Sequence, residues 1–244
     1  ERVAQCQAAI ERLKATIADA ALDALIIVGD DQHEQFLDDN LPAMLIYGGA
    51  TIWNNVLQLP ADAPGWWQRA RAQYHEEKTT RDYPVAAGLA RHMVEYLIGQ
   101  DFDISYSENL PRDHGEGHAF GFVHRRLFGD THIPIVPVVL NTYYPPNQPT
   151  PRRCYALGES IRSAIETWPD PSRVGILASG GLSHFTIDED LDRQILDACR
   201  AGDKQTLCAL PAEKLNSGSS ETRNWIATAG AAEHLTTQWQ EYVP

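Results

Sequence analysis

Short apolar segments that alternate with amphipathic stretches most constrain the fold of this chain. Four of them are 24–29 (ALIIVG), 43–47 (AMLIY), 133–140 (IPIVPVVL) and 173–178 (RVGILA). Their length suits buried strands, which typically run about 5–6 residues. Strands that alternate with helices favour a layered α/β domain. We therefore predict a single α/β domain over 1–244, with a central mixed or parallel sheet flanked by helices.

Helical periodicity fills the intervals between these strands. We expect helices over the first 20 residues, from Pro84 onward, over 155–168, and from a capping box that spans Thr186 to Glu189. A further short strand is expected at 102–106.

Two segments depart from this pattern. Segment 51–80 holds three tryptophans among prolines without a clean period, and we interpret it as a packed loop, with a lid or an interface as alternatives. Segment 133–140 contains Pro134 and Pro137, which remove donors from a strand ladder. We therefore place that strand at a sheet edge or at a bulge.

The charge balance limits the partners of the protein. Lys and Arg number 20 against 33 Asp and Glu, a formal charge of -13, so nucleic acid is not expected as a partner. No apolar run approaches the roughly 20 residues of a membrane-spanning helix, and no secretory signal is evident. The four cysteines show no CxxC spacing, and we expect reduced structural thiols in a cytoplasmic protein.

Polar residues follow three of the predicted strands directly. They are 30–34 (DDQHE), 141–144 (NTYY) and 179–184 (SGGLSH). In open α/β sheets ligands bind beyond the carboxyl ends of the strands, so these segments predict a crevice lined by histidines, carboxylates and tyrosines. Taken singly, each of these residues is better interpreted as part of a turn or a helix cap.

Glu221 opens a predicted helix, and its neighbours four and seven positions on are Trp225 and Thr228. This spacing directs the carboxylate toward the helix side that faces the interior. A buried carboxylate needs a metal ion or another cation as a partner. The alternative is a first-turn acid that the helix dipole stabilises by about 0.3–1 kcal/mol.

The segment His114-Gly-Glu-Gly-His118 places two histidines four residues apart. Its glycines oppose a helix, and its glutamate is out of place for the HExxH zinc motif. The segment also lacks the GxGxxG pattern, and SGGLSH lacks the GxSxG pattern of α/β-hydrolases. We therefore do not expect a zinc protease here.

Three motifs, GEGHAFGFVHRRLFG, ASGGLSHF and SGSSETRNW, together resemble the catalytic-subunit family of protocatechuate 4,5-dioxygenase, in the class III extradiol superfamily. The resemblance runs from about Ala24 to Gly230 and includes the linking stretch NTYYPPNQPTPRRCYALGESIR. It implies a non-haem Fe(II) centre held by two histidines and one glutamate, the facial triad of iron(II) oxygenases. It also implies ring-opening of a catechol, protocatechuate or gallate type diol by O2.

Matched by motif, the resemblance places Glu221 on the family's iron-binding glutamate and His184 on the active-site histidine that acts as a base. His118 falls on a second histidine of the substrate pocket. We also expect Asn141, Tyr143, Tyr144 and Ser183 to bind the substrate.

The family's second iron histidine directly follows an aspartate, whereas here Asp31 precedes Gln32 and then His33. We expect His33 as the ligand with a one-residue slip, and Glu34 or Gln32 as substitutes. The resemblance further implies that the family's N-terminal strand-turn and C-terminal tail lie outside this sequence, and we expect a further histidine ligand upstream of Glu1. The resemblance implies a homodimer or a small partner subunit as the assembly.

Two other hypotheses remain open. The unusual Gln32 favours a non-catalytic binding or assembly member of the same fold. A zinc or dimetal hydrolase could instead use Asp30, Asp31, His33 and His118.

Overall fold

A five-stranded sheet forms the centre of the computed structural model, which describes residues 1–60, 62–129 and 132–244. Its strands in spatial order are β5 (Ser105–Ser107), β2 (Met44–Tyr47), β6 (Ile135–Leu140), β1 (Ala24–Asp30) and β7 (Val174–Ala178). Strand β1 is parallel to β6 and β7, and β2 is parallel to β5, whereas β2 and β6 are antiparallel. This mixed sheet confirms the predicted α/β class.

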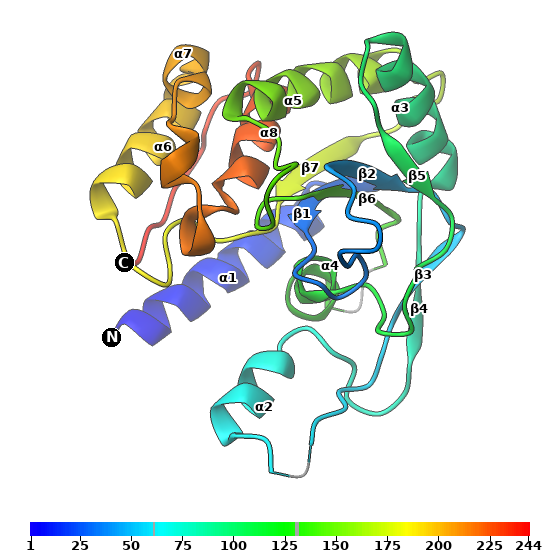
Figure 1. The fold of residues 1–244 in the computed structure, drawn as a ribbon, viewed down its shortest axis with the longest axis vertical. Coiled ribbons are helices and arrows are strands. Elements are labelled where there is room, and N and C mark those ends of the chain that lie inside the picture. Colours follow the sequence, from blue (N-terminus) through cyan, green and yellow to red (C-terminus); the bar gives the residue numbers. More distant parts are fainter. Residues whose placement is uncertain (61, 130–131) are drawn as a thin grey trace.

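Helices cover both faces of the sheet (Figure 1). One face is covered by α3 (Ala87–Gly99), α5 (Pro151–Glu166) and α8 (Thr222–Ala232). The other face is covered by α1 (Arg2–Asp19), α4 (His118–Phe122) and the π-helix Val123–Phe128.

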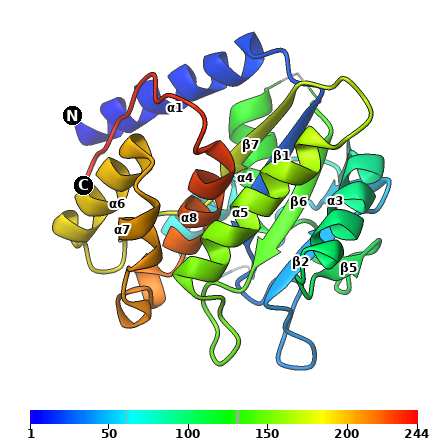
Figure 2. The same cartoon turned by 90° about the horizontal axis from the view of Figure 1, so that it is seen from above.

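Two further helices, α6 and α7, lie beside α5 and α8 (Figure 2), and two short 3-10 turns follow them. Their bounds in chain order are Glu189–Ala201, Lys204–Cys208, Ala212–Lys214 and Ser217–Ser219. No helix in the described part of the chain is long and apolar enough to cross a membrane.

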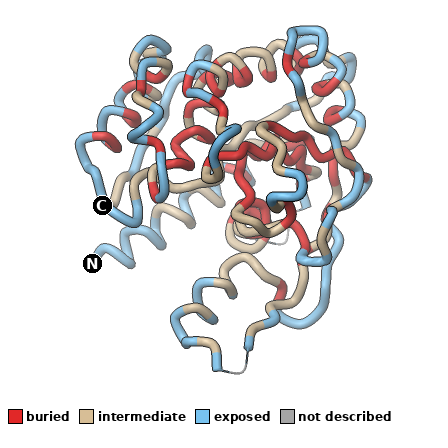
Figure 3. The backbone as a smooth tube through the Cα atoms, viewed as in Figure 1, coloured by how far each residue is buried: buried red, intermediate tan, exposed pale blue. Residues whose placement is uncertain are grey.

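The core alternates along β1 between the two faces. Ile26 and Val28 belong to the cluster under α3, α5 and α8, whereas Leu25 and Ile27 belong to the cluster under α4 and the π-helix. Successive strand residues point to opposite faces, so a strand covered on both faces must be apolar throughout. The buried residues accordingly concentrate at the sheet (Figure 3).

The predicted edge position or bulge at 133–140 is wrong, because β6 lies inside the sheet between β2 and β1 and its register with β1 is unbroken from Ile135 to Leu140. Leu25 N, in β1, donates to the carbonyl oxygen of Pro134, and Asn141 N donates to the carbonyl oxygen of Ala43, next to β2. Even-numbered residues of β6 therefore direct their backbone groups toward β1, and odd-numbered residues direct theirs toward β2. The pairing of β6 with β2 ends at Val138, so Pro137, which has no backbone N–H to donate, lies just beyond the last paired residue.

The interpretation of 51–80 as an irregular packed loop is also wrong. It begins with β3 (Thr51–Asn54), which pairs antiparallel with β4 (Arg81–Pro84), and between them lies α2 (Gly65–Arg71). This segment projects from the body (Figure 1). The pairing joins residues about thirty positions apart, which local periodicity does not reveal.

Several element boundaries differ from the sequence predictions for local reasons. Pro84 ends β4 instead of opening a helix, because Val85 N continues the extended pairing by bonding to Ala50 O. The expected capping box is replaced by Asp188, whose Oδ1 accepts from Leu191 N at 3.0 Å. Aspartate is a stronger N-cap than threonine.

The remaining shifts are small. The helix expected at 155–168 begins earlier, at Pro151, and Thr150 caps it. The strand expected at 102–106 begins at Ser105. Strand β7 is half-buried instead of buried, because it lies at an edge of the sheet.

Candidate metal centre

Three acidic or imidazole side chains converge at the carboxyl end of β1. Asp30 is the last residue of β1, His118 is the first residue of α4, and Glu221 directly precedes α8. One ligand atom from each lies within 4.8 Å of the other two. Two carboxylate oxygens and an imidazole nitrogen are donors that suit a divalent transition metal.

Asp30 is almost fully buried. Its Oδ1 accepts from Asn224 Nδ2 at 3.2 Å, and its Oδ2 lies 3.4 Å from Gln32 Nε2. Burial raises the pKa of Asp30 to about 7, the charge of Glu221 adds to the rise, and His118 opposes it. A cation bound beside this buried carboxylate would stabilise its charged form, because the cation replaces the solvation that burial removes.

Glu221 directs its carboxylate away from its own helix, to which it makes no capping hydrogen bond. The carboxylate accepts from Gln32 Nε2 at 2.9 Å and from the backbone N–H of Gly181. His184 Nε2 lies 4.0 Å from Glu221 Oε1. The helix dipole alone therefore does not account for this residue.

His118 is oriented by Glu34. Its Nδ1 lies 2.8 Å from Glu34 Oε2, and its backbone N–H donates to Glu34 Oε1 at 2.9 Å. Burial lowers the pKa of His118, but the charge and hydrogen bond of Glu34, together with the charges of Asp30 and Glu221, outweigh that effect and raise it to about 10. Because Nδ1 is engaged, Nε2 is the ring nitrogen left to donate to a substrate, or to bind a metal ion that displaces its proton, as in carboxylate–histidine–metal sites.

Gly117 makes this close contact between His118 and Glu34 geometrically feasible. Its φ is +75°, a conformation that L residues rarely adopt, and an added Cβ would lie 2.7 Å from Glu34 Oε2. Gly117 of the HGEGH segment thus permits the approach of Glu34, whereas Gly115 lies against the backbone of Trp53 and Asn55.

Gln32 and His33 take opposite directions. The Gln32 amide bridges Glu221 and Asp30, whereas the His33 ring stacks on Tyr144 with centroids 3.6 Å apart. His33 Nε2 lies 3.6 Å from Asp38 Oδ1. The structure thus brings Gln32 into the cluster, while His33 is not part of the cluster found among the described residues.

His184 lies at the rim of the cluster. Its Nδ1 is 2.8 Å from the carbonyl oxygen of Leu182, an acceptor, so Nδ1 carries the hydrogen. In the neutral imidazole this leaves a lone pair on Nε2, the nitrogen that faces Glu221.

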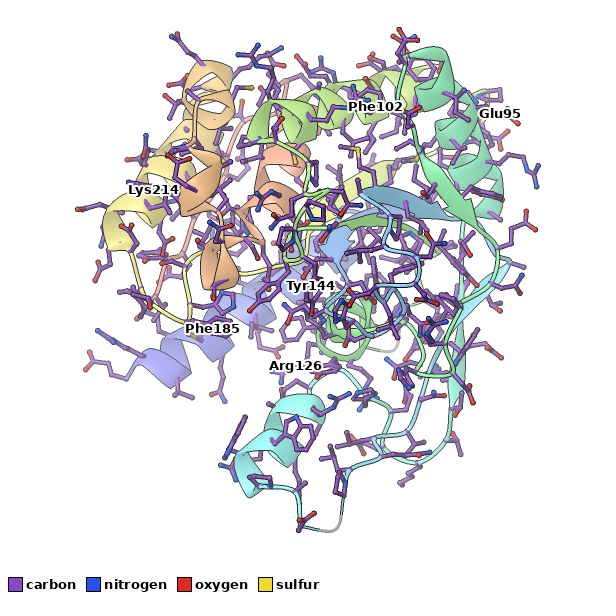
Figure 4. All side chains as sticks on the ribbon, in the orientation of Figure 1. Glu95, Phe102, Arg126, Tyr144, Phe185 and Lys214 are labelled. Atoms are coloured by element: carbon purple, nitrogen blue, oxygen red, sulfur yellow. The ribbon has the colours of Figure 1, made fainter. Side chains whose placement is uncertain are left out.

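A cavity of about 630 Å³ lies over the cluster. Its walls include His118, Glu221 and His184, together with Arg71, Tyr74 and Phe185. Phe185 projects from the loop after β7 (Figure 4) and is largely exposed. The cavity is large enough for a small aromatic molecule.

The residues predicted to bind substrate lie elsewhere. Among the described residues that line this cavity, Asn141, Tyr143, Tyr144 and Ser183 are absent. The Asn141 amide bonds within the turn that contains Tyr144 (Figure 4), and Ser183 donates from N and Oγ to Asp192. In the structure these groups support the loops around the site.

The set of residues required by the hydrolase hypothesis is not assembled. Asp31 accepts from the backbone N–H groups of Glu34, Gln35 and Phe36, so it caps a turn. His33 stacks on Tyr144, as described above. Asp30 and His118 do meet, but Glu221 is their third partner.

Sequence reasoning missed Asp30 as a partner of Glu221, and it also missed Arg71 and Tyr74 in the cavity wall. The signal available for Asp30 was its place at the carboxyl end of a predicted strand, where ligands bind in open α/β sheets. No local signal marked Arg71 and Tyr74, which reach the cavity from the excursion between β3 and β4.

Comparison with known proteins places this site in a family. Residues 68–243 match the family described as the catalytic LigB subunit of aromatic ring-opening dioxygenase. The chain is similar to gallate dioxygenase of Pseudomonas putida, with 37% identity over 129 residues, 48% of this chain and 37% of that protein.

Two proteins named 2,3-dihydroxyphenylpropionate/2,3-dihydroxicinnamic acid 1,2-dioxygenase are also similar. The one from Comamonas testosteroni is 28% identical over 178 residues, 72% of this chain and 47% of that protein. The one from Rhodococcus sp. is 24% identical over 244 residues, 97% and 68% respectively. The chain thus spans half or less of the first relatives it matches. Because the family match covers well over half of the sequence, the chain belongs to the family of catalytic LigB subunits of aromatic ring-opening dioxygenases.

Proposed function

We propose that this chain carries the active site of an Fe(II)-dependent extradiol dioxygenase, which opens the ring of a catechol-type diol with O2. The observation that carries the proposal is the convergence of Asp30, His118 and Glu221 beside His184, at the wall of a cavity. The names of the relatives, which act on gallate and dihydroxyphenylpropionate, support a protocatechuate-like or gallate-like diol as substrate.

The donor set fits the metal that this family requires. Glu221 and Asp30 offer carboxylate oxygens and His118 offers Nε2. Gln32 is the substitute ligand nearest to them, whereas a role for His33 requires that its ring leave Tyr144. When bound, Fe(II) would act as a Lewis acid for the diol oxygens and bring O2 next to the ring.

His184 is proposed as the base. A catechol hydroxyl loses its proton far above neutrality, so an imidazole near the metal must assist. Nε2, which carries the lone pair, faces the cluster and is the atom that would accept this proton. His118, at the cavity wall, is proposed to contact the substrate or the metal through Nε2.

The reaction needs no external reductant. The bond between one hydroxylated carbon of the diol and its ring neighbour outside the diol pair breaks, and both atoms of O2 enter the product. The hydroxylated carbon becomes a carboxylic acid, and the neighbour becomes an aldehyde where it bears hydrogen or a second carboxylic acid where it bears a hydroxyl. The diol supplies the four electrons that reduce O2.

Replacement of the central carboxylate tests the proposal. We expect Glu221→Gln to lose stoichiometric iron, and to lower O2 consumption with protocatechuate or gallate by at least about 100-fold, because a buried metal ligand is removed. Iron is measured after anaerobic reconstitution of the protein, and O2 uptake with an electrode. Glu213→Gln, an exposed position, is the matched control.

Each alternative has its own outcome. Wild-type protein that binds zinc and hydrolyses a substrate without O2 would establish the hydrolase hypothesis. Wild-type protein that binds no stoichiometric metal would establish the non-catalytic hypothesis. A homodimer or small partner subunit, and a cytoplasmic location, stay predictions.

A further inference from the structure

Arg71 stands at the junction of two cavities. The first lies over the cluster of Asp30, His118 and Glu221, and the second has a volume of about 1110 Å³. Arg71 lines both cavities, as do Gln32 and Glu34. A ligand bound at the cluster could therefore extend past Arg71 into the second cavity.

The guanidinium group of Arg71 has unused hydrogen-bonding capacity. Its Nη2 lies 3.3 Å from His75 Nε2, and its Nε is buried without a hydrogen-bond partner among the described residues. None of the ion pairs between described residues includes Arg71. A buried donor without an acceptor is costly, so this group is suited to an acceptor from a ligand.

The position of Arg71 is fixed by its surroundings. Its guanidinium lies over the rings of Trp67 and Tyr74, 5.7 and 5.8 Å from their centroids. Asn54 Nδ2 donates to the carbonyl oxygen of Tyr74 at 2.8 Å. Arg126, which lies between the α2 excursion and the body (Figure 4), donates to Gln73. A guanidinium held in this way loses little freedom when it binds a ligand.

The charges around the first cavity favour an acid as the ligand of Arg71. Among the described residues that line this cavity, Arg71 is the only one with a lysine or arginine side chain. Its charge acts on Glu34, but the Glu34 carboxylate is committed to His118. An uncharged diol carries no group that would form an ion pair with Arg71. A carboxylate on the ring, in contrast, can accept two hydrogen bonds from the planar guanidinium group.

We infer that Arg71 determines substrate specificity by binding the carboxylate of an aromatic diol whose ring lies over the cluster. This inference rests on the proposed function for the position of the diol ring. It adds the residue that separates acidic diols from uncharged ones, and it gives the α2 excursion a role in substrate selection.

Two matched substrates test the role of Arg71. We expect Arg71→Gln to raise the KM for 3,4-dihydroxybenzoate by about 10-fold or more, because a charge-assisted hydrogen bond is lost. The KM for uncharged 4-methylcatechol should change by less than about 2-fold. Arg69→Gln, on the same helix but exposed and outside both cavity walls, is the control and should leave both values unchanged.

A binding experiment keeps this test independent of turnover. Titration calorimetry of the iron-loaded protein without O2 measures the Kd of 3,4-dihydroxybenzoate and of 4-methylcatechol. Arg71→Gln should weaken the first and spare the second. Equal weakening of both, or of neither, would overturn the inference. If the wild type binds the acid through Arg71 but opens no ring, the proposed function fails while the inference stands.

Discussion

At the scale of single residues, the site depends on how Glu34 holds His118. The carboxylate contacts both the ring Nδ1 and the backbone N–H of that residue. The charge of His118 accordingly lowers the pKa of Glu34, although burial opposes the shift. Residues that orient a metal-binding histidine set its ring direction and tautomer.

Substitution of Glu34 by glutamine should weaken metal binding. We expect Glu34→Gln to lower the affinity for Fe(II) by about 10–100-fold, because the amide no longer fixes the ring of His118. Anaerobic competition with a chelator measures this affinity. Glu95→Gln, at an exposed position on α3 away from the site (Figure 4), should behave as wild type. Unchanged affinity in the Glu34 variant would show that His118 does not need this partner.

At the scale of elements, the close crossing of α5 and α8 sets the position of the Glu221 side of the site. An added Cβ on Gly158 of α5 would lie 1.9 Å from the carbonyl oxygen of Ala227 on α8. Asn224, which bonds Asp30, belongs to the same helix α8. The close approach of the two helices depends on the missing side chain of Gly158, and of Gly230 on α8, where an added Cβ would lie 2.3 Å from the carbonyl oxygen of Tyr155.

A methyl group at this crossing should therefore reduce the stability of the protein. We expect Gly158→Ala to lower the free energy of unfolding by about 1–3 kcal/mol, as overpacking does, despite a gain of roughly 1 kcal/mol in helix propensity. Urea unfolding measures this change. Gly99→Ala is the control, because an added Cβ there meets nothing within 4 Å. A Gly158 variant as stable as the Gly99 variant would contradict the close crossing.

At the scale of the whole molecule, the four cysteines differ in burial according to how the helices that carry them pack on the two sides of the sheet. All are free and lie on helices, Cys6 on exposed α1 and Cys154 on buried α5. Burial raises the pKa of the Cys154 thiol to about 12 and that of Cys199 to about 11. The thiolate is the reactive form, so these two groups are nearly inert near neutral pH.

Thiol labelling of the native protein should therefore be strongly graded. We expect Cys6 to react with a disulfide reagent within minutes at pH 8, and Cys154 to react only when the protein unfolds. Mass spectrometry of the labelled peptides measures both rates. Cys6→Ser should remove the fast phase alone. Fast labelling of native Cys154 would contradict the packing of α5 against the sheet.

The sequence predicted the α/β class, Glu221 at the start of a helix, and polar residues beyond three strands. These predictions depend on local patterns, because apolar runs, helical periods and caps are properties of neighbouring residues. The interior position of β6 escaped prediction, since proline chemistry alone suggested an edge and the register with β2 is a long-range property.

The amino-acid sequence by itself thus determined the layers of the fold and the kind of chemistry at the carboxyl ends of its strands. Only the tertiary structure decided that Asp30 and Gln32 turn toward Glu221, that His33 turns away, and that a helix from the excursion delivers Arg71. The physical reason is that alternation fixes which residues share a face, whereas strand order and helix crossing fix which distant residues meet.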